Sequence, residues 1–134
     1  MGINCVLVSG PVIIENGRLL VIKDGKDPFY KIPGGKVEGS ESAEACAGRE
    51  LREETGLMGI IYERLSTYKV PGNNGTSAGE LVHYRAKLQE LPDNFDSYTH
   101  GRHTVFWLPL EEIKSGIHNV APNVEYLVRQ GALK

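Results

Sequence analysis

Short apolar runs separated by turn residues dominate the first third of the chain and predict strands. Residues 4–14 are rich in Val and Ile, and residues 18–23 repeat that character after the turn signal Glu15-Asn16-Gly17. We expect these two runs to form a hairpin. Residues 29–32 are typical of a further short strand, which Pro33-Gly34-Gly35 would end.

A helical period replaces this pattern after the glycine turn. Good helix formers fill residues 41–55, where small and apolar side chains recur every four positions and form one stripe. The stripe consists of Ala43, Ala47 and Leu51. Ser40 is the expected N-cap, and Gly56 is expected to end the helix.

The rest of the chain alternates β-branched runs with polar loops and closes with two short helices. We expect strands at 60–68, 80–88 and 104–108, loops at 71–77 and 91–101, and helices at 109–114 and 122–130. The first two of these strands are expected to pair. Strands alternating with few helices predict an α/β (α+β) fold, with a mixed sheet packed between helices.

Length and composition favour a single globular domain over residues 1–134. The chain is 40% hydrophobic and 24% charged, which is ordinary for such domains. Its 15 basic and 17 acidic residues give a net charge of −2, so no positive field attracts a nucleic-acid polymer or an anionic membrane. No apolar run approaches the roughly 20 residues of a membrane span.

The cysteine content and the first residues of the sequence bear on the cellular compartment. Cys5 and Cys46 form neither a disulfide framework nor a zinc-binding spacing. The sequence also begins without the basic start and long apolar segment of a secretory signal. We therefore expect a cytoplasmic protein with reduced thiols.

A set of carboxylates on the predicted helix carries the clearest chemistry. Glu50, Glu53 and Glu54 are spaced i, i+3 and i+4, which places them on one arc of about 100°. Neighbouring carboxylates repel one another, so their clustering favours a cation between them. Oxygen ligands of this kind suit Mg²⁺, or Mn²⁺.

A magnesium site built from few carboxylates usually completes its shell with water and substrate phosphates. Arg49 can reach Glu53 one turn along the helix, or brace a neighbouring carboxylate. The Gly34-Gly35 turn lets backbone groups approach a metal or phosphate. The alternative interpretation of the same spacing is a solvated, charge-rich helix without a ligand.

The segment from Gly35 to Leu57 resembles the Nudix box, the pattern G-x5-E-x7-R-E-U-x-E-E-x-G-U in which U is a bulky aliphatic residue. The fixed positions are filled by Gly35, Glu41, Arg49, Glu50, Leu51, Glu53, Glu54, Gly56 and Leu57. The resemblance extends more loosely over residues 6–33. It identifies the chain as a member of the Nudix hydrolase (MutT-like) family.

This resemblance implies an α/β/α sandwich whose box forms a loop–helix–loop, and Mg²⁺-dependent hydrolysis of a nucleoside diphosphate linked to another group. Carried onto this sequence, it makes Glu50, Glu53 and Glu54 the metal ligands, joined by the Gly35 carbonyl. Arg49 would orient these glutamates, and Glu41 would be structural or a minor ligand. The implied partner is a small nucleotide, and a homodimer is a candidate assembly because homodimers are frequent among relatives.

The motif leaves the general base open. Relatives often supply it from a glutamate in a loop outside the box, yet residues 91–103 contain no glutamate. The titratable side chains in this region are Asp93, Asp96, His100 and His103. Glu53 or Glu54 could serve instead.

Substrate contacts are expected from lysines and aromatic residues near the glycine turn. Lys23, Lys31 and Lys36 could hold phosphate, and Tyr30 is among the aromatic residues that could stack on a base. The sequence leaves open whether the substrate is a nucleoside triphosphate or a nucleotide sugar such as ADP-ribose. A non-nucleotide diphosphate and a non-catalytic nucleotide sensor are the alternative functions.

Overall fold

The computed structural model describes residues 6–72 and 77–134. Within them the strands are β1 (Val6–Val12), β2 (Ile14–Glu15), β3 (Arg18–Asp24), β4 (Gly35–Lys36), β5 (Gly59–Arg64), β6 (Tyr68–Pro71), β7 (Ser77–Leu88), β8 (Tyr98–His100) and β9 (His103–Pro109). The helices are α1 (Ala43–Thr55), α2 (Leu110–Ser115) and α3 (Pro122–Arg129). The predicted mixture of strands with few helices is confirmed.

The strands form two sheets. The first has the order β4-β1-β7-β5, with β6 also paired to β7. It is mixed, because β1 and β7 run parallel while the other pairs are antiparallel. The second sheet, β2-β3-β9-β8, is antiparallel. The predicted pairing of the runs at 60–68 and 80–88 is confirmed by β5 and β7.

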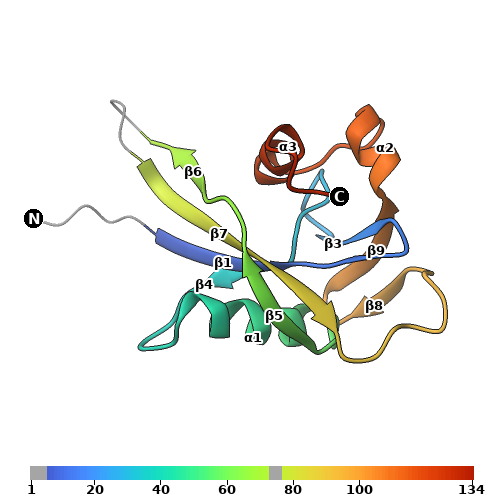
Figure 1. Cartoon of the computed structure of the whole chain (residues 1–134), viewed down its shortest axis with the longest axis horizontal. Helices are drawn as coiled ribbons and strands as arrows, with labels where there is room; N and C mark the ends of the chain where they lie inside the picture. Colours follow the sequence, from blue (N-terminus) through green and yellow to red (C-terminus); the bar gives the residue numbers. More distant parts are fainter. Residues whose placement is uncertain (1–5, 73–76) are drawn as a thin grey trace, which may run out of the picture.

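Helices cover both sides of the strands, as Figure 1 shows: α1 lies on one side, and α2 and α3 lie on the other. Strand β3 contributes side chains to both of the resulting cores. Leu19 and Val21 pack with Val124 and Leu127 of α3. Their chain neighbours point the opposite way, since side chains alternate along a strand, and pack with Leu51 of α1.

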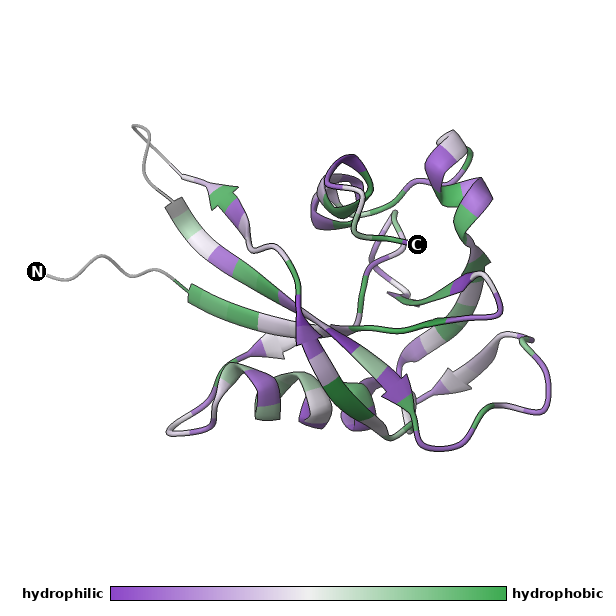
Figure 2. Cartoon of the chain, in the orientation of Figure 1, coloured by the Kyte–Doolittle hydropathy of each residue, from purple (hydrophilic) through white to green (hydrophobic). Residues whose placement is uncertain are grey.

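The four consecutive residues Leu19, Leu20, Val21 and Ile22 are each 0% exposed. Such a continuous apolar run is typical of a strand that is covered on both faces. Figure 2 shows this run as a green segment, whereas purple residues recur along the helices. The layered fold thus follows from the hydrophobic pattern.

The N-terminal hairpin is much shorter than predicted. Residues 4 and 5 of its first predicted strand lie outside the described residues. Strand β1 pairs with β4 and β7, and β2 pairs with β3 over two residues on each strand. The chain passes from the first sheet to the second at Ile13. The turn itself is as expected, because Asn16 and Gly17 have φ of 52° and 70°, typical of a type I′ turn.

Helix α1 begins two residues later than predicted. The N-cap is Ser42 rather than Ser40, because the Ser42 side chain accepts a hydrogen bond from the Ala45 N–H at 3.0 Å. The predicted end is correct: Gly56 is the C-cap, with φ of 77°. The final helices match the prediction to within about one residue, and Pro122 occupies the first turn of α3.

Other differences concern short strands. The expected strand at 60–68 is divided into β5 and β6, and the expected strand at 29–32 forms isolated bridges at Tyr30 and Lys31. Strands β4 and β8 lie in segments expected to be a turn and a loop. Residues 73–76 of the expected loop at 71–77 lie outside the described residues, as does Cys5. No helix in the described part of the chain has the length and apolar character needed to span a membrane.

Candidate active site

Helix α1 holds the predicted acidic residues in a fixed orientation. Its buried side includes Cys46, Ala47, Leu51 and Thr55, which fix the rotation of the helix against the sheets. The acidic side chains lie next to this buried side of the helix. The side chains of Glu50 and Glu54 are 12% and 14% exposed, whereas that of Glu53 is 52% exposed.

Arg49 connects the acidic residues. Its guanidinium donates to Glu41 Oε1 and Oε2 at 2.8 and 3.0 Å, to Glu50 Oε1 at 3.0 Å and to Glu53 Oε1 at 2.7 Å. It also donates to the Lys36 carbonyl at 3.1 Å. The two-pronged contact with Glu41 holds the pKa of that carboxyl down at about 2. Arg49 thus has the geometry of an orienting residue, and Glu41 anchors it.

The glycine turn packs directly on the two buried carboxylates. The Gly34 N–H donates to Glu54 Oε1 at 2.6 Å. A Cβ added at Gly35 would overlap the Glu50 carboxylate, so the glycine lets Glu50 occupy this position. Burial raises the pKa of Glu54 to about 7 and also raises the pKa of Glu50. A bound cation would offset this cost of burying charge.

The residues around the glycine turn decide whether the site suits a metal ion. Among residues 6–72 and 77–134, no group of three His, Cys, Asp or Glu side chains is already arranged around a metal position. Glu50 and Glu53 bind Arg49, and the Gly35 carbonyl accepts the Cys46 thiol at 3.4 Å. The donor set of carboxylates and a backbone carbonyl nevertheless fits a hard cation such as Mg²⁺.

The candidate bases occupy different places. His103 Nε2 lies 3.6 Å from Glu54 Oε2, and burial lowers the His103 pKa. The His100 ring packs instead against Gly56 at the end of α1. Asp96 is exposed, and its backbone N–H bonds the Asn94 side chain. Of these three residues, the structure therefore brings His103 to a carboxylate of α1, that of Glu54.

The candidate substrate residues are also separated. Lys23 Nζ lies 4.6 Å from the centre of the Tyr30 ring, which packs edge-on against Phe106 and His118. Lys36 lies on β4 and is exposed. Lys31 is better placed, since it lines a cavity, and its positive charge acts to lower the pKa values of both Glu54 and His103.

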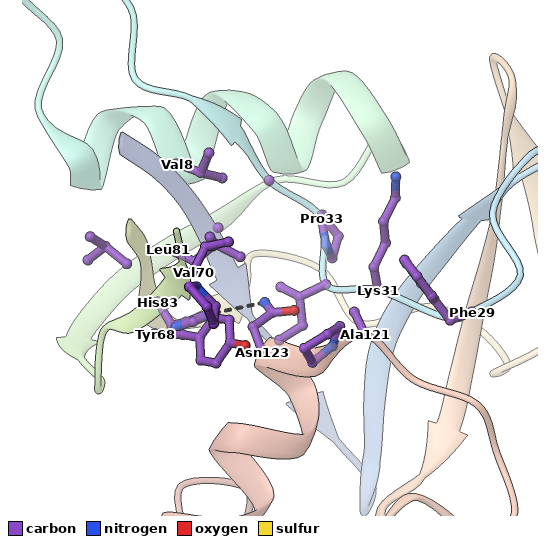
Figure 3. Close-up of a pocket in the computed structure, with 16 residues that line it drawn as sticks. Val8, Phe29, Lys31, Pro33, Tyr68, Val70, Leu81, His83, Ala121 and Asn123 are labelled. Carbon is purple, nitrogen blue, oxygen red and sulfur yellow. Dashed lines mark hydrogen bonds between the residues drawn. The ribbon is translucent and has the colours of Figure 1, made fainter. Parts of the chain in front are cut away.

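This cavity of about 430 Å³ lies between β6, β7, the Pro33-Gly34 turn and the start of α3 (Figure 3). Most of its lining is apolar; its polar residues include Lys31, His83 and Asn123. Gly34 lines the cavity and also bonds Glu54, so the cavity adjoins the carboxylates.

Sequence reasoning missed His83 and Asn123. His83 lies between Val82 and Tyr84 in the strand expected at 80–88, and this position was the available signal. The side chains of His83 and Asn123 meet only after β7 and α3 have packed together.

Comparisons with known proteins identify the domain family. The model of the NUDIX domain matches residues 6–130. A "MutT-like protein" of Streptomyces ambofaciens is 37% identical over 67 residues, covering 50% of this chain and 44% of that protein. A "Putative 8-oxo-dGTP diphosphatase" of Bacillus subtilis (strain 168) is 37% identical over 60 residues, covering 45% of this chain and 40% of that protein. An "ADP-ribose pyrophosphatase" of Methanocaldococcus jannaschii is 38% identical over 69 residues, covering 49% of this chain and 40% of that protein.

Solved structures share the fold. A NUDIX hydrolase from Nitrosomonas europaea superposes with a TM-score of 0.72 at 18% identity, covering 95% of this chain and 88% of that one. A MutT NUDIX hydrolase from Burkholderia pseudomallei superposes with a TM-score of 0.72 at 22% identity, covering 93% of this chain and 96% of that one. By contrast, the chain spans about half, or less, of the length of the curated relatives named above. Since the family model matches nearly all of the sequence and α1 carries the Arg49, Glu50, Glu53 and Glu54 positions of the box, this chain belongs to the NUDIX domain family.

Proposed function

We propose that this protein hydrolyses the diphosphate linkage of a nucleoside diphosphate derivative in a Mg²⁺-dependent reaction. One observation carries the proposal: Gly34 contacts the Glu54 carboxylate and also lines the 430 Å³ cavity. Cavities of this size and apolar character suit small organic ligands. The nucleoside would occupy the cavity, and the diphosphate would extend past the Pro33-Gly34 turn to the carboxylates.

The residues of α1 would hold the metal. We assign Glu50, Glu53 and Glu54 as ligands, joined by the Gly35 carbonyl, and Arg49 as the residue that keeps the glutamates oriented. When bound, Mg²⁺, or Mn²⁺, would neutralise phosphate charge and lower the pKa of a bound water. Arg49 contacts Glu50 and Glu53 through Oε1, at 3.0 and 2.7 Å, so the other oxygen of each carboxylate could bind the metal while Arg49 keeps its contacts.

We assign the proton acceptor to His103. Its lowered pKa keeps the ring neutral near pH 7, so a ring nitrogen can accept a proton from water. His103 also lies against Glu54, which places it beside the proposed metal. His100 and Asp96 lack this contact with the carboxylates and receive no role.

Lys31 is the proposed phosphate contact. Its Nζ lies 2.7 Å from Asp27 Oδ2 and 3.8 Å from Asp24 Oδ2, while its side chain lines the cavity (Figure 3). The two aspartates hold a positive charge between the cavity and the carboxylates. A substrate phosphate could exchange with Asp27 at this ammonium group.

The first experiment is a hydrolysis screen with product identification, with and without a chelator, and with Mg²⁺ and Mn²⁺ compared. Nucleoside triphosphates would release pyrophosphate and a monophosphate, whereas ADP-ribose would release two monophosphates. Both classes are tested because relatives bear both names. We expect chelator-sensitive turnover of one class.

The matched variants for this screen are Glu53→Gln and Glu54→Gln. We expect each to keep the fold and to lower kcat by at least ~100-fold, because the metal loses a charged ligand. Turnover that persists unchanged in both variants would overturn the site. Tight nucleotide binding without turnover would identify a sensor, and turnover of a non-nucleotide diphosphate alone would exclude the nucleotide.

The remaining expectations concern the whole protein. A single domain over residues 1–134, a cytoplasmic location and a homodimer stay predictions. We also predict that the protein does not bind a nucleic-acid polymer, and the net charge of −2 supports this prediction.

A further inference from the structure

A buried polar pair lies in the cavity wall away from the carboxylates. His83 lies on β7 and is 1% exposed; Asn123 is the second residue of α3 and is 8% exposed. Both line the cavity, and Figure 3 shows the hydrogen bond that joins them. Neither side chain has a part in the proposed hydrolysis.

The surroundings of His83 determine which ring nitrogen carries the proton. Nδ1 lies 2.9 Å from the Ser66 carbonyl oxygen, which can only accept, so Nδ1 must donate. Burial lowers the pKa of His83, so the ring is neutral near pH 7. Nε2 therefore carries a lone pair and acts as an acceptor.

This acceptor fixes the Asn123 side chain. Asn123 Nδ2 lies 3.0 Å from His83 Nε2 and donates to it. If the amide flipped, its oxygen would face the Nε2 lone pair, and a buried hydrogen bond would be lost. The amide oxygen is consequently held on the side away from His83, as Figure 3 shows.

The backbone keeps the arrangement rigid. The Leu65 N–H donates to the His83 carbonyl at 2.8 Å, which places the adjacent Ser66 carbonyl beside the ring. Pro122 at the first turn of α3 precedes Asn123 and restricts the backbone there. Both ends of the His83–Asn123 hydrogen bond are thus fixed by main-chain structure.

We propose that His83 is a positioning residue that holds the Asn123 amide oxygen toward the ligand, so that the cavity selects a nucleobase presenting an N–H donor. The inference rests on the proposed nucleotide substrate and deepens it. A site built to hydrogen-bond one group rejects an analogue lacking that group, because its own polar atom is then left unpaired.

The first test is a spectroscopic one on the protein without nucleotide. Long-range ¹H–¹⁵N correlation spectra report which nitrogen of His83 is protonated. We expect a neutral ring with the proton on Nδ1 at pH 7. A proton on Nε2 would overturn the inference directly, whatever the activity of the protein.

The second test compares ATP with purine riboside triphosphate, which lacks only the 6-amino donor, and uses GTP as a further donor-bearing ligand. We expect the wild type to bind ATP or GTP at least about tenfold more tightly than purine riboside triphosphate. In His83→Phe this ratio of affinities should fall below about threefold. In hydrolysis assays of the same variant, KM for ATP or GTP should change more than kcat. His83→Gln, which keeps an acceptor, should restore much of the ratio of affinities.

The control is His118→Gln, since His118 pairs with Glu112 and lies outside the cavity lining. It should keep the wild-type ratio, and thermal unfolding should verify that each variant is folded. An unchanged ratio in folded His83→Phe would overturn the inference, while hydrolysis itself would still stand. Failure of the wild type to bind any of the three triphosphates, together with no turnover of either nucleotide class in the hydrolysis screen, would instead overturn the proposed function.

Discussion

At the scale of single residues, helix spacing is enough to place the acidic residues on one side of α1, while their role as metal ligands stays a prediction. Glu50, Glu53 and Glu54 share a short helix segment, so their common face follows from helix geometry alone. The residues of the cavity could not be found in this way. His83 and Asn123 are separated by 40 positions in the sequence and meet through the packing of β7 against α3. Among the lysines, spacing could not show that Asp27 would hold Lys31 beside the site.

Lys31→Gln tests the proposed phosphate contact. The substitution removes the positive charge at the cavity wall, so we expect KM to rise about tenfold, as for lost ground-state binding, and kcat to fall by a smaller factor because the pKa values of Glu54 and His103 also respond to Lys31. Steady-state kinetics on the substrate found in the screen would measure this. Lys114→Gln, on the exposed side of α2, is the control. Equal KM values for both variants and the wild type would exclude the contact.

Gly35→Ala separates a defect in the site from a defect in folding. The added Cβ would meet the end of the Glu50 side chain, which can move away without shifting the backbone. We expect kcat to fall at least ~10-fold because Glu50 is displaced as a ligand, while the unfolding midpoint changes little. At Gly10, by contrast, the Cβ would overlap the Pro33 carbonyl oxygen.

Gly10→Ala should therefore show the opposite balance. Its steric conflict is with the backbone, so we expect a loss of about 1–3 kcal/mol in the free energy of unfolding. Denaturant titration of both variants would compare the two effects. If Gly35→Ala were the more destabilised of the pair, the assigned contacts would be wrong.

At the scale of secondary structure, elements with a strong local pattern were predicted and those set by distant pairing were not. The α1 helix, its Gly56 end and the type I′ turn at Asn16-Gly17 follow from local chemistry. The parallel partner of β1 lies some seventy residues along the chain, and no local signal identifies it. The two-residue strand β4 and the three-residue strand β8 are too short to show a period.

The N-cap of α1 provides a sharp test, because two serines lie two positions apart. Ser42 caps the Ala45 N–H, so Ser42→Ala should lower the free energy of unfolding by about 1 kcal/mol. Ser40→Ala should change it by less than about 0.5 kcal/mol, as for an ordinary surface position. Chemical denaturation of the two variants would measure both. If Ser40→Ala lowered the free energy of unfolding more than Ser42→Ala, Ser40 would be the N-cap, as the sequence predicts.

At the scale of the whole molecule, β3 joins the two cores. Alternate residues of this strand pack on opposite sides. A substitution at any of its four buried positions therefore disturbs the packing of one core directly, and it also disturbs β3 itself, which both cores share. The unbroken apolar run 19–22 is typical of a strand covered on both faces, whereas no pattern in the sequence indicates that the strands divide into two sheets.

Substitutions in β3 should accordingly be costly. Leu19→Ala and Leu20→Ala remove side chains that are each 0% exposed and contact different cores. We expect each to cost about 2–5 kcal/mol in the free energy of unfolding. Ile60→Ala on β5, where the side chain is 60% exposed, should cost far less. Calorimetric or denaturant unfolding would rank the three.

The placement of the cavity beside α1 has a consequence for how such a protein could diversify. Its walls come largely from β6, β7 and the start of α3, whereas the acidic residues come from α1. The Pro33-Gly34 turn is the shared boundary. Substitutions in the cavity walls could therefore redirect the protein to a different ligand while the helix and its carboxylates are inherited unchanged.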